Sequence, residues 1–135
     1  RMEILENVLS IEKTKHLQEL GVNTGNASMT WMLYPYEEGK QPQLSLREWR
    51  TFKEPFRKEH CIPAFTLLDI LELLPKEIKT GTDTYWITMY FSDNCWHICY
   101  SMSDEFDYYQ EFSSYSLIDA SYEMLCWCVE ERLIP

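Results

Sequence analysis

Glycine is scarce in this sequence, and its scarcity excludes one large class of chemistry. The chain has four glycines, and they lie too far apart to form a GxGxxG loop or a Walker-type loop. Such loops are needed where a glycine-rich backbone wraps the phosphates of a nucleotide. We therefore do not expect phosphate chemistry of that kind.

Long apolar runs are also missing. The longest nearly uncharged stretch, residues 61–74, is interrupted by Pro63, Asp69 and Glu72, so it is too polar to span a bilayer. No basic segment followed by an apolar stretch opens the chain, as it would in a secretory signal peptide. We expect a soluble, unexported protein that makes no membrane contact.

Basic residues are few, and the charge is unevenly spread. The chain has 22 acidic residues against 12 Lys plus Arg, a formal net charge of −10. Residues 103–135 hold eight acids and one base, whereas residues 47–60 hold five bases and three acids. A surface this acidic repels phosphate backbones, so no double-stranded nucleic acid is expected as a partner. One alternative function uses the same charge: an acidic DNA mimic that inhibits a nucleic-acid-binding protein through Asp104, Glu105, Asp107 and Glu111.

The five cysteines, at positions 61, 95, 99, 126 and 128, cannot all pair within one chain. A domain of this length does not need disulfides to fold. The odd number therefore favours reduced thiols in a cytoplasmic protein, and we expect neither a structural metal nor a cofactor.

Cys95, His97 and Cys99 are the one set of residues that suggests a metal site or an active site. On a strand, alternate side chains point to one face, and thiolate and imidazole are donors that zinc prefers. Alternate side chains on a flat strand are nearly 7 Å apart, however, which is too far for all three to reach one ion. The simpler interpretation, in which the three side chains only line the less apolar face of the strand, is favoured over a zinc site. An uncharacterised enzyme built on this Cys/His face remains an alternative function.

Aromatic residues are abundant: they make up 15% of the chain, within a hydrophobic fraction of 45%. This composition predicts a single globular domain over residues 1–135. An antiparallel hairpin with a polar turn is predicted over residues 84–91 and 95–102, and a third strand is predicted over residues 108–115. Helices over residues 67–74 and 117–132 are expected against one face of this sheet. The predicted fold class is α+β, with an antiparallel sheet of three to five strands around a central hairpin, packed by two or three helices.

Shorter elements are expected around this centre. Ser10 can cap a helix over residues 11–20, and residues 28–34 alternate as a strand does. Ser45 and Glu48 have the spacing of a capping box, which predicts a short helix over residues 46–54. Further expectations are a capping start at Thr66–Asp69, burial of the helix over 67–74 on nearly every side, a linker over 76–82, and a cap at Ser116.

One segment has the composition of a recognition surface. Its aromatic residues alternate with basic ones in the order Trp49, Arg50, Phe52, Lys53, Phe56 and Arg57. Aromatics and arginine are enriched at protein interfaces, and the same combination suits single-stranded nucleic acid. The ordinary interpretation is an amphipathic helix with aromatics in the core and charges in water, and the sequence alone favours it.

Three segments carry a resemblance to known proteins. They are CIPAFTLLDILELLP at residues 61–75, ASYEMLCWCVE at residues 120–130 and LQELG at residues 17–21. Together with the aromatic hairpin, they resemble small uncharacterised proteins of Bacteroidetes genomes, phages and mobile elements. The resemblance implies a bacterial or phage cytoplasmic setting, and it implies no catalytic residues.

Taken together, these features predict a small non-enzymatic accessory module of phage or mobile-element type that binds another protein. No triad supports an enzyme, because His60 and Cys61 are sequence neighbours without a third orienting group. The segment from Trp49 to Arg57 is the candidate partner-binding surface.

Overall fold

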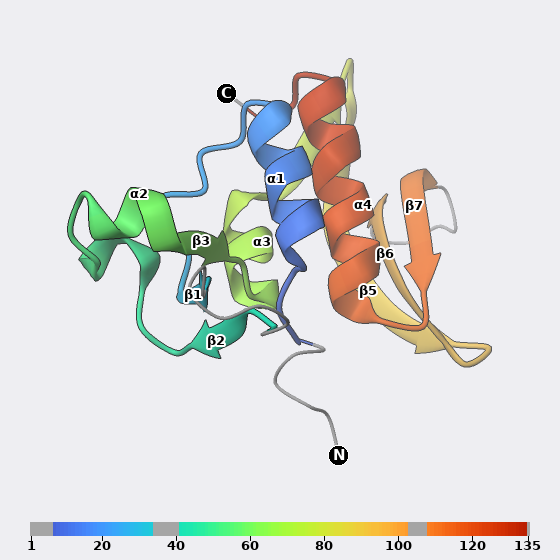
Figure 1. Cartoon of the computed structure of the whole chain (residues 1–135). Helices are drawn as coiled ribbons and strands as arrows, with labels where there is room; N and C mark the ends of the chain where they lie inside the picture. Colours follow the sequence, from blue (N-terminus) through green and yellow to red (C-terminus); the bar gives the residue numbers. More distant parts are fainter. Residues whose placement is uncertain (1–6, 34–40, 103–107, 135) are drawn as a thin grey trace. The chain divides into compact units, whose positions relative to one another are not determined.

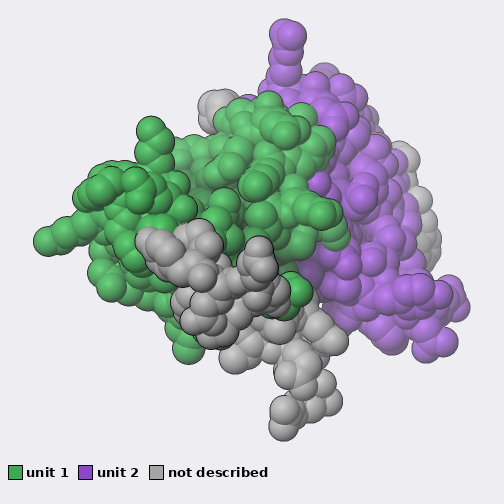
Figure 2. Space-filling model, viewed as in Figure 1, with its two compact units in different colours: residues 1–69 green, residues 70–135 purple. Residues whose placement is uncertain are grey.

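The computed structural model describes residues 7–33, 41–102 and 108–134. They form four α-helices and two antiparallel sheets, so the α+β prediction is confirmed (Figure 1). The chain divides into unit 1, residues 1–69, and unit 2, residues 70–135 (Figure 2). A single domain over residues 1–135 stays a prediction, and the two units are described separately.

Unit 1 is built on a three-stranded sheet. Strand β1 (Met29–Met32) pairs antiparallel with β2 (Gln43–Ser45) on one side and β3 (Cys61–Ala64) on the other. The strand predicted over residues 28–34 is therefore confirmed in its central part, while β2 and β3 were not predicted. Both are three or four residues long, which is too short for a period-two pattern to stand out. A core cluster fills one side of the sheet: Val8, Trp31 and Ala64, with Ile11, Met29, Leu44 and Ile62 packed against it.

Helix α1 (Ile11–Glu19) begins and ends as its sequence predicts. The backbone amide of Lys13 donates to the hydroxyl of Ser10, 3.2 Å away, so Ser10 is the N-cap. At the other end Gly21 has a φ of +91°, a left-handed conformation that glycine adopts without a steric cost. The helix predicted over residues 11–20 is confirmed.

The prediction of a helix over residues 46–54 is wrong. The segment instead forms one 3-10 turn, η2 (Trp49–Thr51), and the short helix α2 (Phe56–His60) follows. Ser45 cannot cap a helix here because its backbone pairs with Thr30 in the sheet, and its hydroxyl accepts from the Arg47 amide.

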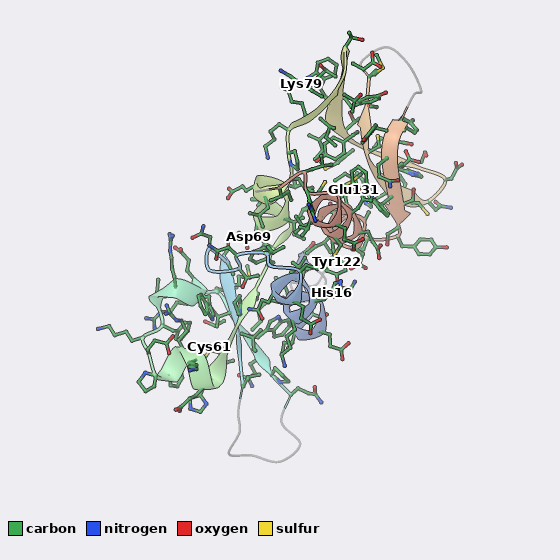
Figure 3. All side chains as sticks on the ribbon, turned by 90° about the horizontal axis from the view of Figure 1, so that it is seen from above. His16, Cys61, Asp69, Lys79, Tyr122 and Glu131 are labelled. Carbon is green, nitrogen blue, oxygen red and sulfur yellow. The ribbon has the colours of Figure 1, made fainter. Side chains whose placement is uncertain are left out.

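Helix α3 (Leu67–Leu73) has the predicted start but not the predicted burial. The Asp69 carboxylate accepts from the Thr66 amide at 2.9 Å, and the Asp69 amide donates to the Thr66 hydroxyl at 3.2 Å, a reciprocal capping box. Figure 3 labels Asp69 at this position. Leu68 is 70% exposed, so the expectation of burial on nearly every side is wrong. Within α3 only Ile70 is fully buried, because a helix of two turns presents one narrow stripe inward.

Unit 2 is built on a four-stranded sheet in the order β4-β5-β6-β7. The strands are β4 (Glu77–Thr80), β5 (Asp83–Ser92), β6 (Cys95–Ser101) and β7 (Tyr108–Ser114). The central hairpin and the third strand are confirmed. Asp93 and Asn94 both have positive φ, as a two-residue hairpin turn requires.

The expectation of a linker over residues 76–82 is wrong, because these residues contain strand β4. Thr80 pairs with Asp83, and Gly81 takes a φ of +58° in the tight turn between the two strands.

Helix α4 (Leu117–Glu130) covers one face of this sheet (Figure 1). The Trp127 ring contacts Tyr109 of β7, and the Cys128 thiol lies 3.9 Å from the Tyr100 hydroxyl. Ile98, Tyr100, Met124, Leu125 and Cys128 are fully buried on this side. The helix is confirmed, although the Ser116 side chain makes no capping hydrogen bond, contrary to expectation. No helix among the described residues is both long and apolar enough to span a membrane.

Candidate functional site

The six residues singled out in the sequence lie on η2, on α2 and in the loop between them. We call Trp49, Arg50, Phe52, Lys53, Phe56 and Arg57 the basic aromatic surface. The segment is tied to the preceding loop, because the Trp49 amide donates to the Ala27 carbonyl and Arg50 donates to the Asn26 side chain. Its backbone is therefore placed by unit 1 itself.

Rings and guanidinium groups alternate across this surface. The Arg57 guanidinium lies 4.4 Å from the centroid of the Trp49 ring, and the Arg47 guanidinium lies 4.4 Å from that of Phe52. The Phe52 and Phe56 rings stack with centroids 6.1 Å apart. Each of these contacts favours a fixed orientation of the ring or the cation.

The aromatic residues of this surface are not in the core. Phe56 is 45% exposed, and neither η2 nor α2 contains a buried residue. Phe52 is half-buried, as is Trp49. The ordinary interpretation, with these aromatics inside an amphipathic helix, is therefore wrong. The cause is the missing helix: a 3-10 turn followed by Pro55 cannot align the three rings on one inward stripe.

Acidic neighbours offset part of the positive charge. Glu48 pairs with Arg50 at 3.0 Å, and Glu54 pairs with Arg57 at 3.1 Å. Arg57 also donates to the Arg50 carbonyl. Lys53 remains exposed, and bases outnumber acids over residues 47–60. The surface thus keeps a net positive charge beside the exposed Phe56 ring.

The Cys/His face of the hairpin has a different organisation from the one that the sequence suggested. Cys95, His97 and Cys99 occupy alternate positions of β6, but Cys99 is fully buried. The two ring nitrogens of His97 face hydroxyls instead: Nδ1 lies 2.6 Å from Ser113 Oγ, and Nε2 lies 3.0 Å from Ser92 Oγ. No group of three His, Cys, Asp or Glu residues in the described ranges is arranged to hold a metal ion.

Two further residues complete this face: Tyr90, which the sequence analysis did not single out, and Glu111, which it named only for DNA mimicry. The Tyr90 ring stacks on His97 at 4.6 Å, and its hydroxyl donates to Glu111 at 2.6 Å. Glu111 also lies 3.9 Å from His97 Nδ1. The strand register pairs Tyr90 with His97. Counting residues outward from the predicted turn on both strands of the hairpin would have predicted that these two side chains lie on the same face.

The buried thiols are poor nucleophiles. Burial raises the pKa of Cys61, of Cys99 and of Cys126, and it raises the pKa of Cys128 to about 11. Thiols with raised pKa values stay protonated at neutral pH, whereas the thiolate is the reactive form. Cys61, labelled in Figure 3, instead contacts the sulfur of Met32.

The carboxylates considered for DNA mimicry are only partly described. Asp104, Glu105 and Asp107 lie outside the described residues, and Glu111 is bonded to Tyr90. DNA mimicry requires a row of free carboxylates, and Glu111 does not provide one because it already accepts a hydrogen bond from Tyr90.

No protein-family model, no curated protein and no solved structure matches this chain. Function is accordingly inferred from the residues of the two surfaces described above.

Proposed function

We propose that the chain is a protein-binding module and that the basic aromatic surface is its recognition surface. The observation that carries this proposal is the exposure of one aromatic ring: Phe56 is 45% exposed beside an arginine-rich segment. Large exposed aromatics next to arginine are the composition that distinguishes the anchor residues of protein interfaces.

The chemistry of the surface defines the partner. Lys53 and Arg50 present positive charge at the edge, and the Phe52–Phe56 pair presents apolar area. An acidic protein segment that also carries an apolar side chain complements both features. Single-stranded nucleic acid is a weaker fit, because the rest of the chain brings the net charge to −10.

The cellular setting belongs to the same proposal. The segment at residues 61–75 resembles proteins of bacterial and phage genomes, and it directly follows α2. An accessory role of phage or mobile-element type in the bacterial cytoplasm follows from that resemblance.

Affinity capture with a charge-reversed variant tests the proposal. Arg50→Glu with Lys53→Glu changes the exposed charges and leaves the two ring-covering arginines, Arg47 and Arg57, in place. The matched control, Lys15→Glu with Lys79→Glu, makes the same charge change at exposed lysines elsewhere.

The expected result is a host protein that wild type and control capture and the surface variant does not. Its identity is then established by mass spectrometry, and its binding is measured with purified components. Equal capture by all three proteins, or loss with the control as well, would contradict the proposal.

A further inference from the structure

Strand β5 has one side that is paired along only part of its length. β4 pairs with residues 83–86 of β5, and the Ile87 amide donates to the Lys76 carbonyl on the same side. Beyond Ile87, no strand in the described part of the chain pairs with that side, whereas β6 pairs with the other side as far as Ser92. We call residues 88–92 the open edge of β5.

The hairpin turn fixes which backbone groups of the open edge point outward. Ser92 and Cys95 flank the two-residue turn, so they form a hydrogen-bonded pair across the hairpin. Bonded and non-bonded pairs alternate in an antiparallel ladder, so Met89 and Phe91 direct their N–H and C=O groups away from β6. The Ile87 amide, which donates on the β4 side, follows the same alternation. The open edge therefore offers two amides and two carbonyls to a further strand.

The open edge also carries exposed apolar side chains. Phe91 is 56% exposed and Met89 is 40% exposed, and both lie on the same face of the strand. The Phe91 ring meets the Trp96 ring edge-on, with centroids 5.3 Å apart, and this contact favours a fixed orientation. Apolar area and outward-pointing backbone groups thus lie together on one short piece of strand.

The other edge strand, β7, is protected in ways that the open edge of β5 is not. The register between β6 and β7 shifts at Tyr100 and Ser101, which leaves Tyr109 as an extra residue on β7. β7 also carries the charged residue Glu111. Bulges and charges are devices that keep a sheet edge from pairing with another chain. The open edge of β5, with the sequence TMYFS, has no charge, no proline and no register shift.

A second copy of this chain fits the open edge by symmetry. A two-fold axis at Tyr90 pairs residues 88–92 antiparallel with the same residues of the second copy. Met89 then lies opposite Phe91 of the second copy, and the two residues exchange backbone hydrogen bonds. Each exposed apolar side chain meets another across the seam. The edge itself is uncharged although the chain carries a net charge of −10, so two copies approach there with little repulsion.

We propose that the chain forms a two-fold symmetric dimer in which the open edges of two β5 strands pair antiparallel. The sheets of two copies of unit 2 are thereby joined into one continuous sheet. An interface of this length is small for a permanent dimer, so the association is reversible, with a Kd in the micromolar to millimolar range.

Sedimentation velocity of the full chain, from about 5 μM to about 1 mM, tests this dimer. The average mass should rise from that of one chain toward that of two and no further, because a two-fold contact is closed. Met89→Pro removes an outward N–H without removing a bond to β6, and it should abolish the rise. Met89→Ala keeps that N–H and should weaken the association less.

Phe91→Lys and a matched control test the position of the contact. Phe91→Lys places a charge on the open edge and should weaken the association about tenfold or more. Tyr115→Lys adds the same charge at an aromatic residue that is 85% exposed and lies outside the open edge, and it should leave the association unchanged. Circular-dichroism melting curves show that each variant compared is folded.

Cysteine cross-linking tests the register, in a Cys95→Ser background that removes the partly exposed native thiol. Tyr90→Cys lies opposite itself at the two-fold axis and should form a disulfide-linked dimer on mild oxidation. Thr88→Cys lies on the same face, but its counterpart in the second copy is four positions away, roughly 13 Å along the strand. It should not cross-link, because that distance is too long for a disulfide.

The mass of one chain at every concentration would overturn the proposal, as would growth beyond two chains. An association that both Met89→Pro and Phe91→Lys leave unchanged would also overturn it. Cross-linking of Thr88→Cys without cross-linking of Tyr90→Cys would overturn the pairing about Tyr90. None of these outcomes bears on the basic aromatic surface of unit 1, because the residues are different.

Discussion

The Arg57 guanidinium lies over the Trp49 ring, 4.4 Å from its centroid, while also pairing with Glu54 and donating to the Arg50 carbonyl. One side chain therefore connects the 3-10 turn η2 with the loop that follows it and with α2. This connection explains how a segment with little regular structure holds its aromatic residues in place.

Arg57→Ala should lower the free energy of unfolding by about 1 kcal/mol, because it removes the cation–π contact and a partly exposed ion pair together. Urea unfolding monitored by circular dichroism measures this. Lys58→Ala, at the next position, which is exposed, is the control and should stay within about 0.5 kcal/mol of wild type. Equal effects of the two variants would mean that Arg57 does not organise the segment.

Asp69 should be the most sensitive carboxylate of unit 1. It accepts hydrogen bonds from the Thr66 amide, the Ser28 amide and the Ser28 hydroxyl. Asp69→Ala leaves these donors without an acceptor, so we expect a loss of about 2–3 kcal/mol. Thermal unfolding of this variant should be compared with that of Glu72→Ala, an exposed change in the same helix. A melting temperature equal to that of the control would disprove the capping role.

The long elements of the fold could be predicted from the sequence, and the short ones could not. The hairpin of β5 and β6 is long enough for alternation and turn residues to agree, and α4 is long enough for a helical stripe. Strands β2 and β3 form only through pairing with β1, and no local pattern specifies them. The capping-box spacing at Ser45 was overridden by that same pairing.

The candidate surface could also be predicted only in part from the sequence. The alternation of rings and bases from Trp49 to Arg57 is visible in the sequence, but their exposure depends on the absence of a helix there. The Tyr90–Glu111 bond joins residues 21 positions apart on non-adjacent strands, and no local pattern predicts it.

Stability should fall at alkaline pH because of a buried thiol. Burial raises the pKa of Cys128 from 9.0 to about 11 in the folded protein. The unfolded chain therefore loses this proton first, so the free energy of unfolding decreases as pH rises from 9 through 11. Burial also raises the pKa of Tyr100 and of Tyr122, which act in the same direction.

Urea midpoints at about pH 8 and about pH 10 measure the alkaline loss. Cys128→Ala should lose less between the two pH values than wild type does, even though its cavity lowers stability at both. An identical loss in the two proteins would mean that Cys128 does not contribute.

One thiol should react well before the other four. Cys95 is half-exposed, whereas Cys61, Cys99, Cys126 and Cys128 are buried. In native protein, Ellman's reagent should therefore modify a single cysteine rapidly, and Cys95→Ser should remove that fast phase. Fast modification of two or more thiols, or a fast phase that survives Cys95→Ser, would contradict the burial described here.

The account depends most on the claim that the basic aromatic surface, with its exposed Phe56 ring, binds a protein partner. The direct measurement is the Kd of Phe56→Ala for the partner obtained by capture, compared with that of Leu68→Ala. Both residues are exposed apolar side chains of unit 1, at 45% and 70%, but only Phe56 belongs to the surface. We expect Phe56→Ala to raise Kd about tenfold or more, as truncation of an aromatic anchor does, and Leu68→Ala to leave it near the wild-type value. Equal Kd values for wild type and Phe56→Ala would contradict the claim.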